Sequence, residues 1–136
     1  AQDAQQKFPL FGVPCQAPTD YHQQFIAATM SGDSTVSVAI SNTGRTHTTI
    51  RVAEAAKQAG GSVISITGDV GPLSDLADLD IRASTFEDTD YYTPTVSRLA
   101  GLVIVDILAS GVAMRRGGDG LERIRVMKER LAQMRG

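Results

Sequence analysis

The chain has 136 residues, of which 42% are hydrophobic and 21% charged, with a formal net charge of −2. This composition excludes a disordered or fibrous protein and indicates one globular domain over residues 1–136. A single cysteine, Cys15, excludes an internal disulfide and offers no metal-site spacing, so we expect no metal and a reducing cytoplasm around the protein.

Two helices are predicted in the first part of the chain. Ala4, Phe8 and Phe11 fall at helical spacing before Gly12, and Asp20 can cap a helix that continues to about residue 30. The first residues lack the charged and apolar regions of a signal peptide, which again favours a cytoplasmic location.

The middle of the chain alternates strand and helix signals. Residues 35–40 predict a strand and 46–59 a helix, residues 62–67 a second strand and 73–77 a short helix, and residues 79–83 a third strand. This order implies right-handed crossovers. We therefore expect a doubly wound α/β fold with a mainly parallel sheet flanked by helices.

Two further helices are predicted towards the end of the chain. The apolar stretch 99–114 is shorter than the roughly 20 residues that cross a bilayer and contains Asp106, which indicates a buried helix of a soluble protein. The wide apolar surface of residues 95–114 predicts a homodimer contact.

The final helix carries most of the positive charge of the chain. The segment from Arg115 to the end contains seven basic and three acidic residues. The preceding 114 residues contain six basic and twelve acidic residues. A nucleic-acid footprint is one explanation of such a helix. Glu122 and Glu129 are interleaved at helical spacing, however, which favours an ordinary solvated face.

The turn between the first predicted strand and its helix has the chemistry of a phosphate site. It consists of Ser41, Asn42, Thr43, Gly44, Arg45 and Thr46. Glycine lets the backbone approach a ligand, the helix N-terminus offers unpaired amides, and the hydroxyls and the guanidinium can donate hydrogen bonds. The same residue types also make plain turns and helix caps. Walker and dinucleotide fingerprints are absent, so we expect no nucleotide or nicotinamide cofactor.

These residues resemble a known family. The turn Ile40-Ser41-Asn42-Thr43-Gly44-Arg45-Thr46, the helix ending at Gly60 and the strand 63–67 are similar to the sugar isomerase (SIS) domain. The closer resemblance is to the effector domain of RpiR-type bacterial transcription regulators. Residues 4–14 and 87–100 resemble the HexR branch, whose members sense 2-keto-3-deoxy-6-phosphogluconate. The resemblance implies a cytoplasmic, dimeric, non-enzymatic domain that binds a phosphorylated sugar or sugar acid.

The chain also departs from the family pattern. SIS domains open with a strand and a serine-bearing G-x-G-x-S turn, whereas this sequence starts after that point. The helix-turn-helix that contacts DNA in such regulators lies outside the chain as well. We therefore expect an N-terminally truncated domain that carries part of the phosphosugar site and needs the regulator's other domain to reach DNA.

Two functional hypotheses remain open from the sequence. The first is a phosphosugar-binding effector domain, in which His47 and Glu87 are possible pocket residues. The second is an aldose-ketose phosphosugar isomerase, in which Glu87, Asp88 or Asp90 supplies the base. We favour the effector domain, because the acidic residues have no evident partner that would set one as acid and another as base. The sequence upstream of Ala1 would separate the two hypotheses.

Overall fold

The computed structural model describes residues 1–88 and 93–134, and these form two compact units. One unit is Pro18–Gly101. The other combines Ala1–Ala17 with the described residues from Leu102 onward. That residues 1–136 act as one domain stays a prediction.

The unit Pro18–Gly101 is built on a parallel sheet of three strands, β1 (Val36–Ser41), β2 (Ser62–Thr67) and β3 (Leu79–Arg82). The strands lie in the order β1-β2-β3, so their carboxyl ends share one edge. At that edge Ser41 is opposite Thr67, and Thr67 is opposite Arg82. The predicted α/β fold with a parallel sheet and flanking helices is confirmed.

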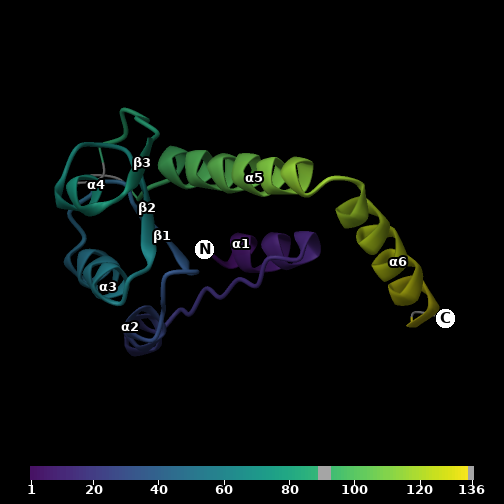
Figure 1. The fold of residues 1–136 in the computed structure, drawn as a ribbon. Helices are drawn as coiled ribbons and strands as arrows, with labels where there is room; N and C mark the ends of the chain where they lie inside the picture. The colour runs from purple at the N-terminus through teal and green to yellow at the C-terminus, as the bar shows by residue number, and fades with distance from the viewer. Residues whose placement is uncertain (89–92, 135–136) are drawn as a thin grey trace. The chain divides into compact units, whose positions relative to one another are not determined.

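Two helices of this unit, α3 (His47–Gln58) and α4 (Pro72–Leu76), lie on the same side of the sheet (Figure 1). The helix α2 (Tyr21–Thr29) packs on α3, and the Asp20 carboxylate caps it as predicted by accepting from the Gln23 N–H at 3.1 Å. The buried core consists of small and aliphatic side chains from these elements: Ala28, Ala53, Ala55, Ala56, Val63 and Leu73. Alanine-rich α3 can therefore approach the sheet closely.

The other unit consists of helices (Figure 1). The first helix α1 (Gln2–Lys7) runs into a 3-10 turn, η1 (Phe8–Phe11), which ends at Gly12 with φ +74°. The long helices are α5 (Val96–Arg116), whose first turns belong to the other unit, and α6 (Gly118–Met134). Within this unit Lys7 pairs with Asp106 of α5, and the Arg116 guanidinium donates to the Gly12 carbonyl at 3.1 Å.

The expectation for α5 needs correction. The helix has 21 residues and exposes most of its apolar side chains, with only Val105 and Ala109 buried among its described residues. In the described part of the chain it is the one helix long and apolar enough to cross a membrane by length and composition. Core helices of soluble proteins pass the same test of length and composition. The predicted length was too short because the apolar run 99–114 was counted without residues 96–98 and 115–116, which extend the helix. The predicted burial is wrong for the chain by itself, because its own described residues cover little of the helix.

Candidate phosphosugar site

The six predicted site residues form one tight turn at the carboxyl end of β1. The Gly44 N–H donates to the Ser41 carbonyl at 3.1 Å, and Gly44 has φ +65°, a left-handed conformation that favours glycine. The Ser41 and Thr46 hydroxyls hydrogen-bond each other at 2.8 Å, and the Thr43 hydroxyl accepts from the Arg45 N–H at 3.2 Å. Ser41 is buried, whereas Thr43, Arg45 and Thr46 are exposed.

The N-terminus of α3 follows directly and carries no side-chain cap. Thr46 is the N-cap residue, but its hydroxyl bonds to Ser41 instead of to the amides of the first turn. These amides therefore stay available to an external acceptor, and the helix dipole favours an anion there. His47, the first residue of the helix, is exposed beside them. The turn and this helix end together suit an anion; that they bind phosphate stays a prediction.

A second turn, Gly68 to Gly71 after β2, packs against the first one. The Gly68 N–H donates to the Asn42 carbonyl at 2.8 Å, and the Leu73 N–H donates to the Gly44 carbonyl at 3.0 Å. A Cβ added at Gly71 would lie 3.0 Å from the Gly44 carbonyl oxygen. Sequence analysis did not assign Gly68 and Gly71 to the site; two glycines directly after a predicted strand were the available signal for a second turn beside it.

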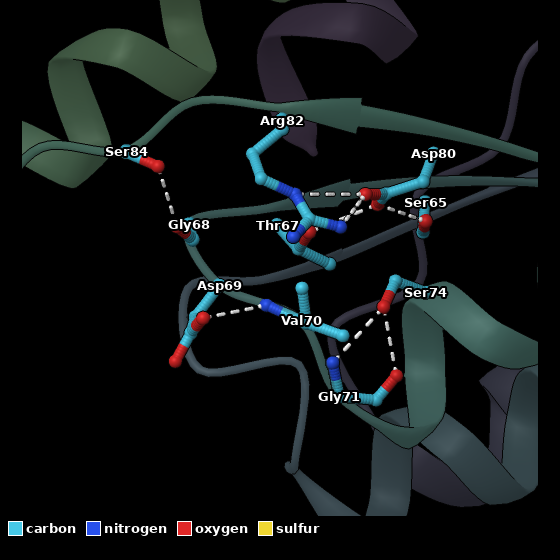
Figure 2. Close-up of polar contacts among 10 residues, drawn as sticks. All are labelled: Ser65, Thr67, Gly68, Asp69, Val70, Gly71, Ser74, Asp80, Arg82 and Ser84. Atoms are coloured by element: carbon cyan, nitrogen blue, oxygen red, sulfur yellow. Dashed lines mark hydrogen bonds and ion pairs between the residues drawn. The ribbon is translucent and has the colours of Figure 1, made fainter.

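A polar cluster lies at the carboxyl ends of β2 and β3 (Figure 2). The Asp80 carboxylate accepts from the Ser65 hydroxyl at 2.5 Å, from the Thr67 hydroxyl at 2.9 Å and from the Arg82 guanidinium. Burial raises the pKa of Asp80, but the hydrogen bonds and the Arg82 charge outweigh it and hold that pKa below its ordinary value. Sequence analysis missed the cluster; the signal was Ser65 and Thr67, two hydroxyl residues that alternate with isoleucines in the second half of the central strand.

Glu87, a possible pocket residue, is bound to the start of α5. Its carboxylate accepts from the Thr95, Val96 and Ser97 N–H groups at 2.6, 3.1 and 3.1 Å and from the Ser97 hydroxyl at 2.8 Å. These hydrogen bonds, led by the one from Thr95, lower the pKa of Glu87 to about 2. Such a carboxylate is a poor general base at neutral pH. Asp90, another candidate base, lies outside the described residues.

Comparison with known proteins gives consistent matches. The family model of the SIS domain matches residues 1–111. The HTH-type transcriptional regulators HexR of Escherichia coli and of Pseudomonas aeruginosa are each 38% identical over 135 residues, which is 99% of this chain and 47% of theirs. The structure of the Vibrio vulnificus NanR protein complexed with ManNAc-6P superposes with a TM-score of 0.85 at 20% identity, over 98% of this chain and 50% of that one.

The chain thus spans about half the length of these curated relatives. The HexR relatives are named as HTH-type transcriptional regulators. The NanR superposition shows the fold of the chain, because its identity is low.

Proposed function

Because the chain belongs to the SIS domain family, we propose that it is the phosphosugar-sensing effector domain of a bacterial transcription regulator of the RpiR type, HexR branch. The observation that carries this proposal is the turn Ser41 to Thr46 before an uncapped helix N-terminus. Such a turn presents hydroxyls and free amides to a dianion. The NanR structure of the same fold is complexed with a sugar phosphate, which supports this class of ligand.

The ligand we propose is 2-keto-3-deoxy-6-phosphogluconate, which the resemblance of residues 4–14 and 87–100 to the HexR branch implies. Its phosphate would accept hydrogen bonds from the hydroxyls of Ser41, Thr43 and Thr46, from Arg45, and from the first amides of α3. His47 and Glu87 stay candidates for the rim of the pocket. Glu87 would act there indirectly, through its hold on the start of α5.

The setting we propose is a cytoplasmic homodimer whose DNA contacts come from a helix-turn-helix domain outside this chain. The HexR relatives carry that domain type in their names and are about twice as long as the chain. Ligand binding here would change the affinity of the whole regulator for DNA, because any ligand with different affinities for two states shifts the balance between them.

The test is calorimetric titration of 2-keto-3-deoxy-6-phosphogluconate into the full-length protein and into two variants, Ser41→Ala and Thr46→Val. Each variant removes a hydroxyl from a charged acceptor, a hydrogen bond worth roughly 1.5 to 3 kcal/mol, so each should weaken binding about tenfold or more. Ser62→Ala, at the opposite end of the sheet, is the matched control and should bind normally. Unchanged affinity in both site variants would refute the phosphate assignment.

A further inference from the structure

The polar cluster of β2 and β3 is unusual for the centre of a parallel sheet. Ser65 and Thr67 are 0% and 1% exposed, and both hydroxyls donate to the Asp80 carboxylate, whose side chain is 16% exposed (Figure 2). Buried hydroxyls and carboxylates lose hydration, and apolar side chains in such positions often give an equally stable fold. Stability alone therefore does not explain the cluster. Its remaining member is Arg82, the group that the cluster holds in place.

Asp80 fixes one edge of the Arg82 guanidinium and leaves other donors free. Its Oδ2 atom accepts from Nε at 3.2 Å and from Nη2 at 2.5 Å. Within residues 1–88 and 93–134 the Nη1 group has no hydrogen-bond acceptor, and the Arg82 side chain is 36% exposed. A guanidinium has five N–H donors in a rigid plane. Arg82 is therefore a pre-oriented cation with unused donors that solvent can reach.

The strand register places Arg82 at the same sheet edge as the phosphate turn. Ser41, Thr67 and Arg82 are in-register neighbours on β1, β2 and β3, so they share a face of the sheet. Two strand spacings separate the backbones of Ser41 and Arg82, roughly 10 Å. That separation is too large for one phosphate group to contact both residues directly, but an extended phosphorylated sugar can approach both.

We propose that Arg82 is a second anion-binding residue of this site, which binds the carboxylate that the proposed ligand, 2-keto-3-deoxy-6-phosphogluconate, carries at the end remote from its phosphate. A guanidinium pairs with a carboxylate through two parallel hydrogen bonds, which a neutral sugar end cannot accept with the same strength. This inference rests on the proposed function, because the turn Ser41 to Thr46 holds the phosphate.

The experiment compares two ligands of equal carbon number in the full-length protein: 6-phosphogluconate, which has the carboxylate, and glucose 6-phosphate, which lacks it. Arg82→Gln should weaken 6-phosphogluconate binding about tenfold or more and leave the affinity for glucose 6-phosphate unchanged. Arg51→Gln, on an exposed position of α3, is the matched control and should alter neither affinity.

A further variant distinguishes a lost ligand contact from a structural effect of the unpaired Asp80 carboxylate. Arg82→Gln leaves Asp80 without its cation, so the double variant Asp80→Asn/Arg82→Gln, which removes both charges, should show the same loss for 6-phosphogluconate alone. Unchanged affinity for 6-phosphogluconate, or an equal loss for both ligands, would overturn the proposal while leaving the phosphate site intact. Ser41→Ala weakens both ligands if the proposed function holds; a wild-type protein that binds neither ligand would refute both proposals.

Discussion

Glu87 shows how one side chain links two parts of the chain. Its carboxylate accepts hydrogen bonds from three backbone N–H groups and one hydroxyl at the start of α5, eight to ten residues further along the chain. These amides are the donors that a helix N-terminus leaves without internal partners. The carboxylate therefore links Glu87 to the start of α5 and caps the helix with a full negative charge, which the helix dipole favours.

The cap predicts a specific dependence of stability on pH. The pKa of Glu87 falls from 4.5 to about 2 on folding, so the ionised carboxylate stabilises the fold above pH 4.5. This contribution is lost as the pH falls from 4.5 through 2. Glu87→Gln should lower the thermal unfolding midpoint at pH 6, and the difference from wild type should vanish near pH 2.

Thermal unfolding of wild type and variant over this pH range measures the effect, and taking their difference removes the titration of all other groups. Glu54→Gln on α3 is the matched control for the loss of one carboxylate outside the cap. A Glu87→Gln protein as stable as wild type at pH 6 would contradict the capping role.

At the scale of elements, the two turns after β1 and β2 form one backbone assembly. The Gly68 and Leu73 N–H groups donate to the carbonyls of Asn42 and Gly44, respectively. Little room is left between the backbones of the two turns. The phosphate turn is thereby held by its neighbour as well as by its own hydrogen bonds. A site that must recognise a phosphate by several short hydrogen bonds needs such support, because small displacements weaken every bond at once.

This assembly predicts that Gly71→Ala impairs both stability and ligand binding. The new Cβ would lie 3.0 Å from the Gly44 carbonyl oxygen and 3.2 Å from that of Thr43, so the phosphate turn must move. We expect a loss of about 1 to 3 kcal/mol in the free energy of unfolding, as for other overpacked sites, together with weaker phosphosugar binding.

Chemical denaturation and calorimetry of the full-length protein test this expectation. Gly32→Ala is the control, because a Cβ at Gly32 meets no atom within 4 Å. If Gly71→Ala binds phosphosugars as tightly as Gly32→Ala does, the second turn does not support the first.

At the scale of the whole molecule, the apolar surface of α5 supports the proposed homodimer. Leu99, Val103 and Ile107 recur at four-residue spacing and are 58%, 56% and 63% exposed. Exposed apolar side chains in such a row mark contact surfaces. Because monomers seldom leave a stripe of this kind in water, we expect it to be covered by the second subunit.

Val103→Asp should therefore shift the full-length protein from dimer to monomer, because an unpaired carboxylate in an apolar interface is strongly unfavourable. Light scattering at micromolar concentration measures the mass, and Val103→Thr is the size-matched control that should remain dimeric. Circular dichroism confirms that each variant is folded. A folded wild-type protein that is monomeric under these conditions would refute the dimer.

The sequence by itself determined the elements and the main candidate site. Each predicted strand and helix was found near its expected place, because the signals for them are local in the sequence. These signals are the helix and strand periodicities, the cap residue Asp20, and the glycines at 44 and 60. The turn Ser41 to Thr46 was found for the same reason, because its residues are contiguous and their chemistry follows from one short segment.

Only the tertiary structure decided how distant residues combine. Strand register brings Thr67 and Arg82 into line with Ser41, and turn packing brings Gly71 against Gly44. Glu87 was identified as a pocket candidate, but its hydrogen bonds to the start of α5 join residues eight to ten positions apart, which the local sequence does not predict. Such contacts are set by the packing of strands and turns that lie far apart in the sequence, and local residue preferences carry no information about that packing.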